Sequence, residues 1–83
     1  DDINQPILIS PNPFTDHFTI KLDKAYANVY IAISNLYGGV DSMKFNDTNN
    51  ITYMAGYLPI GFYLVRVYID KKYYDFKLLK VKN

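Results

Sequence analysis

The sequence predicts an all-β fold, an antiparallel β-sandwich of about seven short strands. Tyr, Phe and β-branched residues favour strands, and the 83 residues include nine Tyr and five Phe. Short stretches that alternate apolar and polar residues are separated by Gly, Pro, Asn and Asp, and no stretch keeps the apolar period of a helix. This pattern indicates an immunoglobulin-like architecture, although the Cys and Trp of antibody domains are absent.

The first part of the chain predicts two strands and a connection. Residues 7–9 are apolar and follow Pro6, which predicts a short edge strand because Pro cannot donate a backbone hydrogen bond. Residues 17–22 alternate strictly, so we expect a strand whose apolar side chains face inward. Residues 23–28 are interpreted as a connection to the next strand.

A hairpin is predicted next. Residues 29–34 and 40–45 form its strands, and residues 35–39 form a turn in which a Gly pair permits positive φ. Residues 46–50 are polar, and we expect them to be a flexible connection. A short strand at residues 51–54 follows.

The longest predicted strand covers residues 61–69. Pro59 and Gly61 form the turn before it, since Pro fixes φ at about −65° and Gly accepts positive φ. Both faces of the strand are largely apolar, so we expect it to be central, with one face covered and the other at least half covered. Residues 73–81 return after a turn at residues 70–72, which makes a second hairpin.

Composition limits the functional classes. We interpret residues 1–83 as a single domain, because a chain of this length builds one core. Cys is absent, so neither a disulfide nor a Cys-ligated metal is expected. The net charge of +1 is too small to predict a nucleic-acid partner. No apolar run reaches the ~18 residues of a membrane span, so none is predicted.

No enzyme activity, cofactor or metal site is predicted. His17 is the single histidine and lies on the polar side of an alternating strand, where a solvated side chain is expected. The serines lack the Gly-flanked turn of a nucleophile elbow. The Asp residues fall at turns and strand ends, without the close spacing that a calcium loop requires.

The tyrosines leave a binding function open. A set of exposed tyrosines could form a platform on which sugars stack: Tyr30, Tyr37, Tyr57, Tyr68 and Tyr73. The simpler interpretation is that a small sandwich uses Tyr to extend its core to the edge. A stand-alone exported immunoglobulin-like module that binds carbohydrate or protein is therefore the alternative to the function given next.

Four short motifs follow one another along the chain. They are Pro11-Asn12-Pro13, a Leu-Tyr-Gly turn that ends at Gly38, Leu58-Pro59-Ile60-Gly61-Phe62-Tyr63, and Lys77-Leu78-Leu79-Lys80. In this order they resemble the type A C-terminal sorting domain of the type IX (Por) secretion system of Bacteroidetes. The resemblance covers nearly the whole chain, from about Ile7 to Asn83.

The resemblance implies that the domain is an address and not a catalyst. Such domains end a larger exported cargo, which crosses the inner membrane by the Sec route, passes through the periplasm and is directed to the outer-membrane type IX translocon. In many members a sortase-like surface protease removes the domain, and the cargo remains at the cell surface or leaves the cell. The resemblance places the sorting motifs at Pro11, Asn12, Pro13, Gly38, Leu58, Pro59, Gly61, Tyr63, Lys77 and Lys80.

Two positions depart from the family pattern. The family often has Asp where Asn35 stands and a basic residue where Gly39 stands, so we expect a more flexible and less charged hairpin tip. Recognition is affected if the translocon recognises this tip, and it is unaffected if the translocon recognises the C-terminal strand.

Our hypothesis is that the last strand is the recognised part. An exposed terminal edge is a template for strand addition, and we expect the lysines near it to be solvated. These lysines are Lys71, Lys72, Lys77, Lys80 and Lys82. The alternative is that they only protect an edge strand from aggregation. Open edges in so small a sandwich also permit a strand-exchanged dimer.

Overall fold

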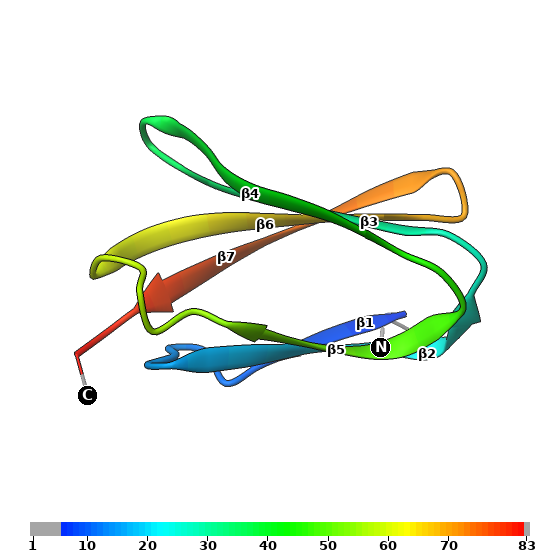
Figure 1. Cartoon of the computed structure of the whole chain (residues 1–83), viewed down its shortest axis with the longest axis horizontal. Helices are drawn as coiled ribbons and strands as arrows, with labels where there is room; N and C mark the ends of the chain where they lie inside the picture. Colours follow the sequence, from blue (N-terminus) through cyan, green and yellow to red (C-terminus); the bar gives the residue numbers. More distant parts are fainter. Residues whose placement is uncertain (1–5, 83) are drawn as a thin grey trace, which may run out of the picture.

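The computed structural model describes residues 6–82, so the first five residues and Asn83 of the predicted domain lie outside the described part. Seven strands form two sheets that pack face to face (Figure 1). The all-β, immunoglobulin-like sandwich that the sequence predicts is confirmed. The strands are β1 (Ile7–Ser10), β2 (His17–Tyr26), β3 (Val29–Asn35), β4 (Gly38–Phe45), β5 (Thr48–Met54), β6 (Gly61–Ile69) and β7 (Lys72–Lys80).

The strand pairs of both sheets are antiparallel. One sheet has the order β1-β2-β5 and the other the order β4-β3-β6-β7. β1 lies at an edge, as the Pro before it predicts, and β3–β4 and β6–β7 are the two predicted hairpins. β6 pairs with β3 on one side and β7 on the other, so the prediction that it is central is confirmed.

The core lies between the two sheets. On β6 the inward residues Tyr63, Val65 and Val67 are almost fully buried, as the alternation predicts. The rings of Phe14 and Phe18 meet edge to face with their centroids 5.1 Å apart, a favourable aromatic geometry. Apolar packing of this kind holds the two layers together in a chain without Cys.

Strand limits in the first sheet differ from the prediction. β2 continues to Tyr26, whereas the sequence predicts a connection from residue 23. The amide of Asp23 donates to the carbonyl oxygen of Pro6 at 2.9 Å, and Tyr26 pairs with Thr48 of β5 after an irregularity. The same pairing places Thr48 and the two residues after it in β5, where the sequence predicts a flexible segment. Partners from distant parts of the chain thus override weak local strand propensity.

The outward face of β6 agrees with the prediction only in part. The sequence predicts that this face is at least half covered, which holds for Leu64, 38% exposed, and for the half-buried Tyr68, whereas Phe62 is 55% exposed. The described residues form only two layers, so outward side chains contact one another along the sheet and not a third layer. Large apolar side chains are therefore presented to solvent on the four-stranded sheet.

Local interactions shape the hairpin turns. The Oδ1 of Asn35 accepts a hydrogen bond from the amide of Tyr37 at 2.8 Å, which is an Asx turn that an Asp carboxylate also makes. Gly38 has a φ of +130°, which L side chains rarely adopt. In the second hairpin Asp70 and Lys71 both have positive φ, as a type I′ turn requires. The Asn at position 35 therefore removes a charge from the tip while keeping the turn.

Candidate functional site

The Asn12 side chain covers part of the outer edge of β7. Its Nδ2 donates to the carbonyl oxygen of Lys77 at 3.1 Å, and its Oδ1 accepts from the amide of Leu79 at 3.0 Å. A primary amide carries a donor and an acceptor in one plane, so it satisfies two backbone groups as a paired strand would. The flanking Pro11 and Pro13 are exposed, and both of their preceding peptide bonds are cis.

The backbone of Phe14 continues along the same edge. The Phe14 amide donates to the carbonyl oxygen of Leu79, and the Val81 amide donates to that of Phe14, both at 2.9 Å. These bonds accompany a parallel bridge between Phe14 and Lys80. Residues 11–14 and residues 77–81 therefore form one hydrogen-bonded unit, which we call the clamp.

Lys80 is the buried cation of the clamp. The sequence predicts a solvated charge, but only 6% of this residue is exposed, so that prediction is wrong. Its Nζ donates to the carbonyl oxygens of Ala55 at 2.8 Å and Gly56 at 3.4 Å, and lies 5.8 Å from the centre of the Phe14 ring. These contacts offset part of the cost of burying the ammonium group. The other lysines of this region are exposed, as predicted: Lys71, Lys72, Lys77 and Lys82.

The third motif builds the turn into β6. The hydroxyl of Tyr63 donates to the carbonyl oxygen of Pro59 at 2.6 Å, which holds the turn against the strand it precedes. Burial raises the pKa of the Tyr63 phenol, so this donor keeps its proton at neutral pH. Gly61 has a φ of +147°, in a region that favours glycine.

The third and fourth motifs meet at one carbonyl group. The carbonyl oxygen of Ala55 accepts from the amide of Leu58 at 3.1 Å and from the Nζ of Lys80. The Ala55 amide in turn donates to the carbonyl oxygen of Asp16 at 2.8 Å. Ala55 and Leu58 are both buried, so this short segment is fixed from several sides. The clamp thus ties the last strand to the turn that begins β6.

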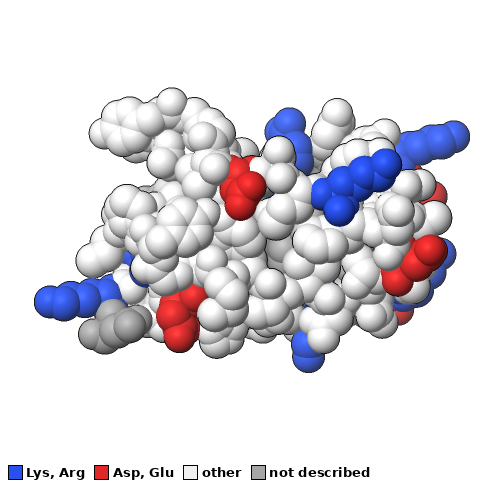
Figure 2. All heavy atoms as spheres, in the orientation of Figure 1, with Lys and Arg blue, Asp and Glu red and all other residues white. Residues whose placement is uncertain are grey.

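Gly38, the remaining motif residue, lies outside the clamp in the tip of the β3–β4 hairpin. The two tip residues Leu36 and Tyr37 are 93% and 95% exposed. Figure 1 places this tip, the β5–β6 connection and the C-terminal end of β7 at the same end of the sandwich. In Figure 2 the tip, at the upper left, carries no charged side chain. The tip is therefore an uncharged projection beside the clamp.

A shallow hollow joins the tip to the last strand. Leu36 of the tip, Phe62 of β6 and Lys77 of β7 line it, and a second hollow lies between the tip and the turn at Ile60. The Lys77 ammonium lies 4.3 Å from the centre of the Phe62 ring, a cation–π contact. The sequence leaves open whether the translocon recognises the tip or the last strand. In the structure, the two border one surface. We call it the end surface: Leu36, Tyr37, Ile60, Phe62 and Lys77.

A tyrosine pair that the sequence does not reveal joins the two sheets. The Tyr53 hydroxyl of β5 donates to Oδ2 of Asp41 on β4 at 2.8 Å and is also hydrogen-bonded to the Tyr57 hydroxyl. Burial, followed by these two hydrogen bonds, raises the pKa of Tyr53 far above its usual range. Because the partners lie on different sheets, no spacing rule along the chain identifies them.

The five tyrosines of the predicted sugar platform do not form one surface. Tyr30, Tyr68 and Tyr73 lie together on the outward face of the four-stranded sheet. Tyr37 lies at the hairpin tip and Tyr57 lies beside Tyr53. The prediction thus contains one real cluster and two unrelated residues.

The remaining carboxylates and the single histidine form no metal-binding cluster. Within residues 6–82, no group of three or more His, Cys, Asp or Glu side chains could hold a metal ion. The Nδ1 of His17 lies 2.8 Å from Oδ1 of Asp16, and this hydrogen bond holds the pKa of the Asp16 carboxyl below its usual range. The part of the chain that the structure describes has no helix long and apolar enough to cross a membrane.

The fold and the clamp define a small immunoglobulin-like sandwich whose last strand is held in place by a loop from the start of the chain. A family model described as the secretion system C-terminal sorting domain matches residues 8–81. Because this match covers nearly the whole chain, the protein belongs to that family, and the resemblance to type IX sorting domains is confirmed. A search of curated proteins found no match to the chain. The chain is thus a secretion sorting signal, and its family is not an enzyme family.

Proposed function

We propose that this domain directs a cargo protein, fused ahead of it, through the outer-membrane translocon of the type IX system. The observation that carries the proposal is the family match over residues 8–81. In this proposal the cargo passes through the periplasm and reaches the cell surface or the medium, where a sortase-like protease removes the domain. The domain is therefore a substrate that other proteins bind.

Three of the motif residues, Asn12, Tyr63 and Lys80, act by holding the fold. Asn12 and Lys80 use their polar atoms on backbone groups of the domain itself. The hydroxyl of Tyr63 likewise donates to the carbonyl oxygen of Pro59. Groups engaged in this way cannot offer the same hydrogen bonds to a partner unless the domain opens. We therefore assign them a positioning role in sorting.

The end surface is the part that the translocon contacts in this proposal. Leu36 and Tyr37 are almost fully exposed, although exposing large apolar side chains to water is unfavourable. Lys77 is the lysine of the last strand that borders this surface. Strand addition along the end of β7 requires displacement of Asn12 and Phe14, which already occupy that edge. Side chains of the end surface need no such displacement.

A reporter enzyme tests the sorting function. The reporter carries a Sec signal, is fused ahead of residues 1–83, and is expressed in a Bacteroidetes host with a working type IX system. We expect delivery to the surface or medium, and periplasmic retention in a translocon mutant. Retention of a folded, intact fusion in the wild-type host would show that the chain is not a sufficient address.

Tip variants test the contact surface separately. The double variant Leu36→Ser, Tyr37→Ser should keep its thermal stability, because the tip makes little contact with the core. The reporter fusion that carries it should stay in the periplasm, because the proposed contact with the translocon is lost. Leu8→Ser is the matched control, since Leu8 is 62% exposed on the other sheet. Normal delivery of the tip variant would overturn the proposal that the translocon contacts the end surface, while leaving the proposed sorting function intact.

A further inference from the structure

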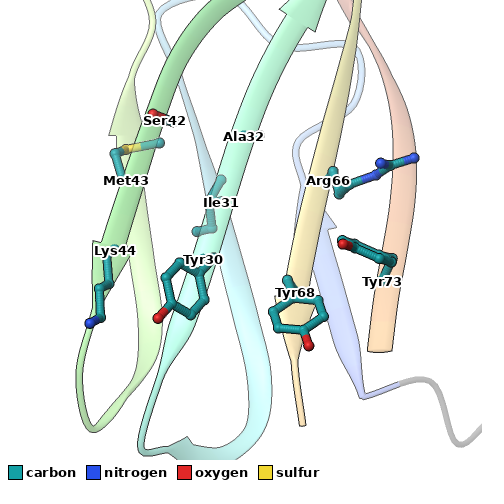
Figure 3. Close-up of a pocket in the computed structure, with 9 residues that line it drawn as sticks. All are labelled: Tyr30, Ile31, Ala32, Ser42, Met43, Lys44, Arg66, Tyr68 and Tyr73. Atoms are coloured by element: carbon teal, nitrogen blue, oxygen red, sulfur yellow. The ribbon is translucent and has the colours of Figure 1, made fainter. Parts of the chain in front are cut away.

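A row of side chains crosses the outward face of the four-stranded sheet at one level. Lys44 of β4, Tyr30 of β3, Tyr68 of β6 and Tyr73 of β7 are each directly opposite the next in the strand register. Figure 3 shows these residues side by side on neighbouring strands. We call them the tyrosine row. The row contains none of the sorting motif residues, so the sorting function leaves it unexplained.

The rings of the row support one another. The centroids of Tyr30 and Tyr68 are 6.0 Å apart, and those of Tyr68 and Tyr73 are 4.8 Å apart. A cation lies near each end, because the Lys44 Nζ is 5.4 Å from the Tyr30 centroid and the Arg66 guanidinium is 4.9 Å from the Tyr73 centroid. Neighbouring strands are about 4.8 Å apart, similar to the width of a sugar ring. The ring planes are inclined by 60° between Tyr30 and Tyr68 and by 48° between Tyr68 and Tyr73, so the row offers three separate aromatic surfaces, one for each successive sugar unit.

A second row, polar at three of its four positions, runs parallel to the tyrosine row. Its members are directly opposite one another in the strand register: Ser42, Ala32, Arg66 and Asp75. Arg66 donates from Nε and Nη2 to the Asp75 carboxylate at 2.7 and 2.9 Å. Ala32 is small, and a hollow above it is lined by side chains of both rows (Figure 3). Aromatic faces and hydrogen-bonding groups thus border the same hollow.

This combination matches the two kinds of surface on a saccharide. The C–H faces of a pyranose ring stack on aromatic side chains, and its hydroxyls bond to hydroxyl, guanidinium and carboxylate groups. Tyr and Arg are also common in protein interfaces, but Lys and Asp are depleted there, so Lys44 and Asp75 are the residues that disfavour a protein partner. Here Lys44, Arg66 and Asp75 lie within or beside the aromatic patch.

The charges indicate which class of saccharide fits. Asp75 neutralises Arg66, whereas Lys44 forms no ion pair with another residue in the range 6–82. The Lys44 end of the row is therefore positive. We propose that the tyrosine row binds an acidic oligosaccharide whose rings stack on Tyr30, Tyr68 and Tyr73 and whose carboxylate lies near Lys44.

A nuclear magnetic resonance titration tests this proposal on the full chain. The probes are an oligogalacturonide, which carries a carboxylate on each ring, and a neutral malto-oligosaccharide, both at millimolar concentration. We expect shifts of backbone and tyrosine signals confined to the two rows, and stronger binding of the oligogalacturonide. Tyr73→Ala should weaken binding of both probes about tenfold, because it removes one stacking face.

Two further variants make the test specific. Lys44→Gln should weaken binding of the oligogalacturonide several-fold and leave the neutral probe unchanged. Tyr37→Ala at the hairpin tip is the matched control, because it removes an exposed tyrosine outside the row, and it should change neither affinity.

Three results would overturn the proposal. The first is the absence of shifts with either probe, and the second is equal binding of both probes. The third is self-association in sedimentation experiments that Tyr73→Ala abolishes, which would make the row a protein interface. Reporter delivery plays no part in this test, so its failure leaves the sorting function untouched.

Discussion

The clamp and the hairpin tip lie at one end of the same sandwich and have opposite physical character. Side-chain polar atoms of the clamp are hydrogen-bonded within the domain, as the two hydrogen bonds of Asn12 and the buried Nζ of Lys80 show. The tip instead exposes Leu36 and Tyr37 almost completely. The motifs most readily recognised in the sequence therefore mainly hold the sandwich closed. The residues proposed for contact are those with little part in closing it.

Lys77 and Lys80 repeat this contrast within one strand. They are three positions apart, and an odd separation places two side chains on opposite faces of a strand. Lys77 accordingly lies outside, against the Phe62 ring, and Lys80 lies inside, against Ala55. The motif spacing itself therefore requires one solvated and one buried lysine.

The largest expected effect separates two phenylalanines. Phe14→Ala should lower the free energy of unfolding by about 3–5 kcal/mol, because the Phe14 ring is buried in the core beside the clamp. Phe62→Ala on the outward face should cost far less, since that ring is half exposed. Urea denaturation of both variants measures the difference. Equal losses would mean that the two regions do not differ as described.

The next effect concerns the two lysines of the last motif. Lys80→Met keeps the apolar stem but removes the donors to Ala55 and Gly56, so the free energy of unfolding should fall by about 2–3 kcal/mol. Lys77→Met should change it by less than about 0.5 kcal/mol. A larger loss of stability for Lys77→Met than for Lys80→Met in thermal melts would contradict the buried role of Lys80.

Asn12→Ala should have a smaller effect, a loss of about 1–2 kcal/mol, because two hydrogen bonds at an exposed edge are removed. Amide hydrogen exchange of Leu79 should speed up, since its acceptor is gone. Asn46→Ala, at an exposed site between β4 and β5, is the control. An unchanged exchange rate at Leu79 would argue that Asn12 does not hold this edge.

The Arg66–Asp75 pair should respond to pH, whereas the clamp should not. The hydrogen bond from Arg66 holds the pKa of the Asp75 carboxyl below its usual range, so this exposed pair contributes stability above about pH 4. That contribution is lost as the pH falls through the lowered pKa of the folded state. Acid titration of Asp75→Asn should lack this loss. The side-chain bonds of the clamp use no carboxylate, so protection of the Leu79 amide should persist over the same range.

Much of the fold follows from the sequence because it depends on local patterns. The alternation in β6 predicts which side chains enter the core, and Asp70-Lys71 predicts the turn of the second hairpin. The extension of β2 beyond residue 22 does not follow, because Asp23, Lys24 and Ala25 favour strands weakly and their pairing depends on distant partners.

The clamp shows the same limit within the site. The sequence marks Asn12 and Lys80 through the family motifs, but their acceptors lie in other segments. One signal was available for Lys80, since strand alternation places it on the same face as the buried Leu78. The tyrosine row depends on the register between β3, β6 and β7, which residue types alone do not fix.

The bonds of Asn12 to β7 also determine when the domain can fold. They join residues 65 and 67 positions apart, and β7 is synthesised after the other six strands. Contacts of such long sequence separation form late and slowly, because the intervening chain must be ordered first. During translation the segment from β1 to β6 lacks the strand that completes its edge, so it stays open until β7 has left the ribosome. We therefore expect the domain to reach its complete fold only after the whole of β7 has been synthesised.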